Sequence, residues 1–335
     1  MKRLMLSGLF AAATLVAASA AVAQDYKERT IKFGTQNAAG HPIVVGMDKF
    51  KEIVESKSKG KIKVNVFPAA QLGNDQFHVS GVQGGTIEMS VMNSGILASQ
   101  VPAFAIFDFP FIFVNEKEAD AVVDGPFGKK MHTRLEEKGI VGLGYWELGF
   151  RNMTNSKRPL NKVEDIAGLK IRVIPNPINL DWVRALDANP TPLPFPELYG
   201  ALENKAVDGQ ENPIPTIKTN KFAEVQKHLA ITKHVYNPQS VMFSKKVWDT
   251  MTADEKKLFI DATAEAGLMQ RKLSREAVSK DLEELKKAGM QVTEFSPAET
   301  LKFVDKVKPV ITKYAANVGS EVVNELFGEL VKLRK

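Results

Sequence analysis

The spacing of hydrophobic and polar positions changes repeatedly in the N-terminal part of the chain. Apolar and polar side chains alternate over residues 30–35, which predicts a strand. Apolar residues then recur at helical spacing over residues 42–57, and residues 62–66 alternate again as a second strand. This order predicts a parallel α/β sheet. The polar loop 36–41 follows the first strand at its carboxyl end, where ligands bind in sheets of this kind.

The next segments repeat this order and then become rich in aromatic residues. Asn74 predicts the start of a helix over residues 75–83, and residues 87–92 form a buried type of strand that ends at Asn93. Residues 104–113 carry several Phe and Ile side chains around an Asp and a Pro. We interpret them as core and as an interface between two lobes, because large aromatic side chains are mostly buried.

Three polar residues lie at breaks in the pattern of the central region. Arg151 follows the β-prone apolar run 140–146 after a short turn, where a new extended stretch begins. Arg172 belongs to the alternating run 169–173, so its guanidinium points away from the apolar face of that run. Asn212 ends another strand candidate between a glycine and a proline. Loops at strand ends carry the ligand sites of α/β proteins, so these residues are site candidates.

Two arginines and one amide in such places predict a carboxylate site. The planar guanidinium matches a carboxylate with two parallel hydrogen bonds and stays charged when it is partly desolvated. The chain contains 45 Lys and Arg residues, so a solvated or salt-bridged surface position is the alternative for each arginine.

The C-terminal part predicts a return to the first lobe, followed by helices. Residues 234–241 have strand character and would bring Gln239 to the side of a cleft. A capping box begins a helical pattern over residues 252–287. This pattern predicts either one helix spanning both lobes or two helices joined near Gly267. The amphipathic tail 318–333 is expected to dock on a lobe.

Four stretches read GFRNMTNSKRP, GLKIRV, PTPLPFPELYGALENKAVDGQENP and KHLAITKHVYNPQSVMFSKKVWD. They resemble the periplasmic solute-binding proteins of tripartite ATP-independent periplasmic (TRAP) transporters, the DctP-type family, and the similarity extends from about residue 30 to the C-terminus. The resemblance implies a two-lobed α/β periplasmic-binding-protein architecture with a central ligand cleft and a long helix spanning both lobes. In that family the arginine of GLKIRV, here Arg172, forms the main salt bridge to the ligand carboxylate. The resemblance also implies ligand contacts for Arg151 and Asn212.

The resemblance and the strand-end loops together define the expected ligand contacts. Family similarity places Asn93 at a ligand-contacting strand end and Phe195 at the pocket floor, with an ordinary buried aromatic residue as the alternative for Phe195. The alternative for His41 is a hydrogen-bonded structural role, and Glu211 could orient the arginines instead of touching ligand. The expected ligand-binding residues are Arg172, Arg151, Asn212, Asn93, Gln36, Asn37, His41, Phe195, Glu211 and Gln239.

The 335 residues are long for one core and suit two domains after a removable leader. Residues 1–23 start with a basic pair, continue with an apolar run and end in Ala-Val-Ala, which predicts a cleaved signal peptide and a periplasmic protein. The apolar run is too short for a membrane anchor, and no cysteine follows it for lipidation. We assign residues 24–148 plus 238–277 to lobe I, and residues 149–237 plus 278–335 to lobe II.

Composition excludes several classes of protein. The absence of cysteine excludes disulfides, a thiolate nucleophile and sulfur-ligated metal. The five histidines show no paired metal-binding motif, so we expect no metal and no cofactor. Removal of the signal peptide lowers the net charge from +6 by the charges of Lys2 and Arg3, and no basic block suggests nucleic-acid binding. We expect a monomer.

A secreted hydrolase that uses the carboxylate pair Glu147 and Glu211 is the strongest enzyme alternative. Both glutamates could equally orient Arg151 and Arg172, and the sequence contains no nucleophile elbow or Walker loop. We therefore expect no enzyme. The resemblance implies a protein that captures an organic acid anion and delivers it to TRAP membrane subunits. Amide and hydroxyl groups in the loops favour a sugar acid or hydroxylated monocarboxylate, with a C4-dicarboxylate as the alternative.

Overall fold

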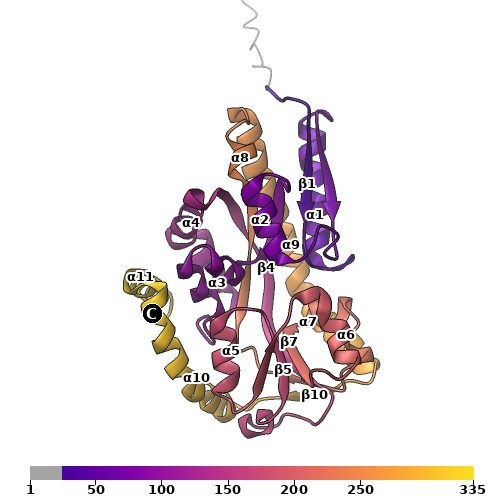
Figure 1. Ribbon diagram of the computed structural model, residues 1–335, viewed down its shortest axis with the longest axis vertical. Helices are drawn as coiled ribbons and strands as arrows, with labels where there is room; N and C mark the ends of the chain where they lie inside the picture. The colour runs from indigo at the N-terminus through magenta and orange to yellow at the C-terminus, as the bar shows by residue number, and fades with distance from the viewer. Residues whose placement is uncertain (1–24) are drawn as a thin grey trace, which may run out of the picture.

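Two long antiparallel strands run through the middle of the molecule and connect its two lobes (Figure 1). They are β4 (Ile140–Asn155) and β9 (Tyr236–Ser244) in the computed structural model, which describes residues 25–335. The sheet continues from β9 into β3, β1 and β2, and from β4 into β7, β5 and β6. The predicted α/β architecture is confirmed, and each lobe contributes one end of a mixed sheet.

The first lobe begins with the predicted β-α-β unit. Its strands are β1 (Arg29–Gly34), β2 (Ile62–Phe67) and β3 (Met89–Asn93), and its helices are α1 (Pro42–Lys57) and α2 (Asp75–Gly84). β1 pairs in parallel with both β2 and β3, whereas β3 pairs antiparallel with β9. Asn74 caps α2 by accepting a hydrogen bond from the backbone N–H of Phe77, as its position predicts.

The turn predicted between residue 146 and Arg151 is wrong, because β4 is one continuous strand. Gly149 has a φ of 107° and lies in an irregularity of the pairing between β4 and β9. A bulge accommodates such a glycine without ending the strand, whereas sequence reasoning treats glycine as a turn residue. The continuous strand carries Arg151 from the lobe junction directly into the second part of the sheet.

The second lobe is built on the other end of β4. β7 (Gly209–Pro213) pairs antiparallel with β4, and β5 (Lys170–Val173) pairs in parallel with β7 and with the proline-rich edge strand β6 (Asn189–Pro192). β8 (His228–Ile231) also pairs with β4 and extends to β10 (Gln291–Glu294), a strand that the sequence did not predict. The helices of this region are α5 (Pro177–Arg184), α6 (Leu198–Glu203) and α7 (Ile214–Thr219).

The longest helix, α9 (Ala253–Lys287), is a single helix, so the prediction of one helix is confirmed over that of two. Thr252 and Glu255 form the predicted capping box at its start. Gly267 lies inside this continuous helix and makes room for Trp146, whose ring would be 2.8 Å from an added Cβ atom. The helix packs against both α1 and α7 and therefore spans the two lobes.

The segment 104–113 is core, as its aromatic residues predict. Phe104, Phe107 and Phe109 are fully buried. Their cluster also contains Trp182 from α5 and residues from the C-terminal helices, so it joins elements distant in the sequence. This segment includes the end of a short 3-10 helix (Pro102–Asp108) that packs against α5.

The remaining helices cover the outside of both lobes. α10 packs against α5, and α11 packs against α3, where Arg334 pairs with Glu118. No helix within residues 25–335 is long and apolar enough to cross a bilayer. The predicted signal peptide lies outside the described residues, and the lobe boundaries remain a prediction. These helices are α3 (Glu116–Asp124), α4 (Pro126–Thr133), α8 (Lys245–Trp248), α10 (Pro297–Val318) and α11 (Ser320–Leu333).

Candidate functional site

A cavity lies where the strand ends of the two lobes meet, and it brings together eight of the ten predicted site residues. Its wall includes the loop after β1, the end of β3 and residues of β4, β5 and β7. His41 and Glu211 do not line it. The role of all ten residues in ligand binding remains a prediction. The eight lining residues are Gln36, Asn37, Asn93, Arg151, Arg172, Phe195, Asn212 and Gln239.

Arg172 is a buried cation with no acidic partner among the residues described. Its Nε and Nη2 atoms donate hydrogen bonds to the carbonyl oxygen of Leu193, at 2.9 and 2.7 Å. The guanidinium carbon lies 5.7 Å from the centre of the Phe195 ring. Nη1 has no hydrogen-bond partner, and only 1% of the residue is exposed. Burial lowers the pKa of Arg172 to about 10, so the guanidinium stays charged at neutral pH.

Arg151 is engaged by protein partners. Its Nε and Nη2 atoms form a bidentate ion pair with the carboxylate of Glu211, and Nη2 also donates to the backbone carbonyl of Glu211. Nη1 donates to Asn237 at 2.8 Å. A guanidinium has five N–H donors, so this arrangement leaves Arg151 little capacity for a ligand. Glu211 therefore holds Arg151 in place, and contact of either residue with a ligand remains a prediction.

Glu211 is itself held ionised by its neighbours. Burial alone would raise its pKa, but the charge of Arg151 and hydrogen bonds from His234 and Arg151 outweigh this effect and lower the pKa to about 2. The Nε2 atom of His234 lies 3.2 Å from Glu211, and its Nδ1 atom lies 2.8 Å from the hydroxyl of Thr232. The positive charge of Arg151 is thus largely neutralised before any ligand binds.

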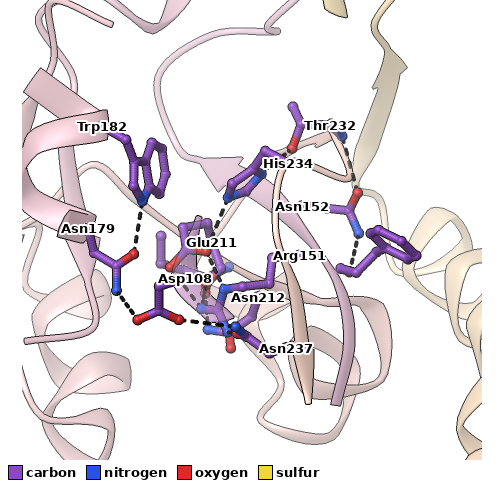
Figure 2. Close-up of polar contacts among 12 residues, drawn as sticks. Asp108, Arg151, Asn152, Asn179, Trp182, Glu211, Asn212, Thr232, His234 and Asn237 are labelled. Carbon is purple, nitrogen blue, oxygen red and sulfur yellow. Dashed lines mark hydrogen bonds and ion pairs between the residues drawn. The ribbon is translucent and has the colours of Figure 1, made fainter. Parts of the chain in front are cut away.

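A buried polar network connects Arg151 through Asn237 to Asp108 and α5, as Figure 2 shows. Asp108 accepts hydrogen bonds from Asn237 and Asn179, and Asn179 accepts one from the indole nitrogen of Trp182. Asn176 also donates to Asp108, at 2.9 Å. Sequence reasoning placed Asp108 in the core and did not predict this network. It connects the 3-10 helix Pro102–Asp108 to α5, and it holds Arg151 through Asn237.

The amides of the first lobe present unpaired atoms at the cavity. Gln36 donates to the carbonyl of Gly73, but its Oε1 atom has no partner. Asn93 accepts from the N–H of Gly95 through Oδ1, and its Nδ2 atom has no partner. Both residues are more than nine-tenths buried. Buried polar atoms normally have hydrogen-bond partners, so these atoms indicate positions that a polar ligand would satisfy.

Both ring nitrogens of His41 are engaged within the protein. Its Nδ1 atom accepts a hydrogen bond from the N–H of Ile43 and so caps α1. Its Nε2 atom lies 3.1 Å from the hydroxyl of Thr216, which belongs to α7 in the second lobe and lines the cavity. Burial lowers the pKa of His41 to about 3, so the ring is neutral. His41 therefore connects the lobes behind the cavity wall.

Sequence reasoning missed several residues that line the cavity. Asp75 lies in the first turn of α2, where it was read only as part of a helix start. Its position beside the loop after β2, near the carboxyl ends of the strands, was the available signal. The other missed residues are mainly apolar, and nothing in the local sequence of these apolar residues distinguishes them from core. They include Met92, Ile96, Leu148, Ile174 and Thr216.

The two carboxylates of the hydrolase alternative are each paired with an arginine of the protein. Glu147 pairs with Arg275 and accepts a hydrogen bond from Tyr236, so the expectation that it orients Arg151 or Arg172 is wrong. Neither Glu147 nor Glu211 lines the cavity. Within residues 25–335, no group of three or more histidines and carboxylates is placed to hold a metal ion. The cavity offers charge and hydrogen bonds for binding.

Comparison with known proteins gives a consistent family match. The family model for DctP, described as bacterial extracellular solute-binding protein, family 7, matches residues 33–317. The 2,3-diketo-L-gulonate-binding periplasmic protein YiaO of Escherichia coli (strain K12) is 36% identical over 264 residues, which are 79% of this chain and 80% of that protein.

Solved structures of similar proteins share the whole fold. The sugar acid binding protein DctPAm from Advenella mimigardefordensis, in complex with galactonate, is 42% identical with a TM-score of 0.90 and covers 92% of this chain and 99% of its own. A TRAP periplasmic solute binding protein from Polaromonas sp. JS666, bound to D-erythronate, is 37% identical with a TM-score of 0.86. That match covers 89% of this chain and 98% of the other.

Proposed function

Because this chain belongs to the DctP family of bacterial extracellular solute-binding proteins, we propose that it captures a hydroxylated monocarboxylate, in particular a sugar acid, in the periplasm. The carrying observation is Arg172, a buried guanidinium without an acidic partner that faces a cavity rich in amides. Two similar structures contain galactonate and D-erythronate, which are ligands of this class.

The carboxylate of the ligand binds to Arg172. A buried unpaired cation is unfavourable, and an anion that accepts hydrogen bonds from it removes this cost. Nη1 has no protein partner, and the nearby Nδ2 atom of Asn93 is also an unpaired donor at the same cavity. Hydrogen bonds to charged groups contribute about 1.5–3 kcal/mol each, which makes Arg172 the main source of affinity.

The charges of the cavity favour a ligand with one carboxylate over a ligand with two. Arg172 has a guanidinium nitrogen without any hydrogen-bond partner, whereas Glu211 neutralises Arg151. The polar wall is otherwise neutral apart from Asp75 and suits hydroxyl groups, which both donate and accept hydrogen bonds. Its amide side chains are Gln36, Asn37, Asn74, Gln76, Asn93, Asn212 and Gln239. A C4-dicarboxylate would leave its second carboxylate without a cation.

Ligand contacts from both lobes would favour a closed conformation. Gln36 and Asn93 come from the first lobe, and Arg172 comes from the second. A ligand that touches both lobes binds the closed form more tightly and shifts the population toward it. We expect a monomer that delivers its ligand chemically unchanged to the membrane subunits of a TRAP transporter.

Isothermal titration calorimetry on wild type and Arg172→Ala tests this function. D-Galactonate, D-gluconate and D-erythronate serve as monocarboxylates, and succinate, D-galactose and L-lysine serve as comparison ligands. Wild type should bind at least one of the three monocarboxylates. The variant should bind that ligand about 100-fold more weakly, or not at all, because it loses two or more charged hydrogen bonds.

Arg184→Ala is the matched control, because Arg184 lies at the end of α5 on the surface and pairs with Asp181. It should bind like wild type. Binding of succinate but of none of the hydroxylated acids would contradict the ligand class. Unchanged affinity in Arg172→Ala would contradict the anchor.

A further inference from the structure

Asp75 is the acidic residue among those that line the cavity in the described chain. It lies in the first turn of α2, and its side chain is partly buried. No residue of the described chain forms a salt bridge or a side-chain hydrogen bond with its carboxylate. The carboxylate is therefore available to the ligand.

The surroundings of Asp75 make this charge costly. Burial raises the pKa of Asp75 to about 7, although the positive charge of Arg172 acts in the opposite direction. Carboxylates without partners are rarely kept in such places unless a ligand uses them. The same wall contains the uncharged amides of Asn74 and Gln76 on either side of Asp75 in the sequence. An amide at position 75 would fill similar space without the charge.

We propose that Asp75 is a specificity-determining residue that accepts hydrogen bonds from ligand hydroxyls and excludes acids carrying a second carboxylate. The inference rests on the proposed function, because it takes Arg172 as the anchor of the first carboxylate. A hydroxyl group donates to a carboxylate, so a polyhydroxy monocarboxylate satisfies Asp75. A second ligand carboxylate lacks a hydrogen to donate and meets a like charge in a desolvated site.

Pairs of ligands that differ only at one end provide the test. D-Galactonate and galactarate share their carbon skeleton, and the second replaces a terminal CH₂OH group with a carboxylate. D-Gluconate with D-glucarate, and D-erythronate with meso-tartrate, form two further pairs. Dissociation constants for each pair are measured by calorimetry at pH 8 for wild type, Asp75→Asn and Glu197→Gln.

For the monocarboxylate that wild type binds, the matching diacid should bind at least about 100-fold more weakly, because a like-charge contact costs several kcal/mol. Asp75→Asn should reduce this discrimination by about 10-fold or more, mainly through tighter binding of the diacid. Glu197 acts on Arg172 through its charge but lies outside the cavity wall and is exposed. Glu197→Gln should therefore keep the discrimination of wild type.

Two results would overturn the inference separately from the proposed function. Wild type could bind a monocarboxylate while Asp75→Asn keeps the same ratio between diacid and monoacid, which would remove Asp75 as the determinant. Glu197→Gln could reduce the discrimination between diacid and monoacid as much as Asp75→Asn does. The discrimination would then depend on net charge at a distance and not on contact with Asp75. If wild type binds no hydroxylated monocarboxylate and binds succinate, the proposed function fails first and the inference fails with it.

Discussion

Asp75 and Arg172 are residues of the cavity that should lower the stability of the ligand-free protein and favour ligand binding. Both groups are charged, at least partly buried and without a partner of opposite charge in hydrogen-bonding contact. Folding removes them from water without providing full compensation, so each is less favourable than an uncharged residue of similar size. Under the proposed function, the ligand provides the missing contacts. Residues of this kind should therefore lower the stability of the free protein and raise that of the complex.

Asp75 makes a testable contribution to the pH dependence of the ligand-free protein. Its pKa is about 7 in the folded protein and near 3.9 in an unfolded chain, so between these values the folded state binds more protons. This group therefore lowers stability as pH rises from about 4 to 7. Asp75→Asn should melt at a higher temperature than wild type at pH 8, and the difference should shrink toward zero at pH 4.

Differential scanning calorimetry without ligand at pH 4.5, 6 and 8 measures this difference. The charge that acts on the pKa of Asp75 is that of Arg172, and His78 is a titratable residue on the same helix. Burial lowers the pKa of His78 to about 4, so His78 stays neutral over most of this range. These groups are the same in both proteins and cancel in the comparison. A variant that is less stable than wild type at pH 8 would contradict the unfavourable placement of Asp75.

At the residue scale, the sequence predicted which positions meet but not how each side chain is used. Arg172, Asn212 and Asn93 follow or end strands, so their convergence on one cavity follows from the sheet. The pairing of Arg151 with Glu211 depends on the register between β4 and β7, in which Met153 lies opposite Glu211. The spacing of residues within β4 or within β7 does not specify which residues lie opposite one another. Asp75 was missed because an acidic first-turn residue has a sufficient explanation in helix stability.

At the scale of elements, local signals predicted helices better than long-range strand pairings. α1, α2 and α9 carry caps or a proline at their starts, and their observed limits agree with the predicted ones. β8 and β10 pair although some sixty residues separate them, as the register of His228 with Gln291 shows. Such pairing is decided by tertiary packing and leaves no periodic signal within either segment.

The contact between α1 and α7 predicts a second determinant of affinity. The hydrogen bond between His41 at the start of α1 and Thr216 of α7 connects the two lobes, and both residues are buried. Thr216→Val keeps the size of the side chain but leaves a buried nitrogen of His41 unpaired, which costs about 1–2 kcal/mol in the closed form. Affinity should fall about 5- to 30-fold for every monocarboxylate that binds.

Thr216→Ser is the control for this prediction, because it keeps the hydroxyl and should bind nearly like wild type. Calorimetric titration of both variants with at least two ligands of different length separates the two roles of Thr216. An equal loss across ligands indicates a contact between lobes. A loss confined to one ligand would mean that Thr216 acts by touching that ligand, and the lobe contact would then be unimportant.

At the scale of the whole molecule, the two lobes are joined by continuous elements that can change conformation. β4 passes through both lobes and contains irregular pairing at Gly149, and α9 packs on α1 in one lobe and α7 in the other. A glycine at a bulge absorbs changes in backbone angles that a regular strand would resist. Opening of the cleft would therefore change the backbone angles of few residues but would separate Arg172 from Gln36 and Asn93.

Closure of the whole molecule should depend on Arg172. To move the lobes from 1% to 99% closed, a ligand must bind the closed form about 10⁴-fold more tightly, which corresponds to about 5.5 kcal/mol. Two charged hydrogen bonds from Arg172 that form only in the closed form would supply about 3–6 kcal/mol, or roughly that whole amount. Small-angle X-ray scattering should show a smaller radius of gyration for wild type with saturating ligand, and a mixture of forms for Arg172→Ala at equal occupancy.

The control at this scale is Arg184→Ala, which should close like wild type because Arg184 lies on the surface away from the cavity. Equal occupancy matters, since weak binding alone would also leave the variant open. If Arg172→Ala closed fully once saturated, the remaining contacts across the cleft, including that between His41 and Thr216, would suffice to hold the lobes together. Arg172 would then select the ligand by its charge while the lobe contacts drive the closure.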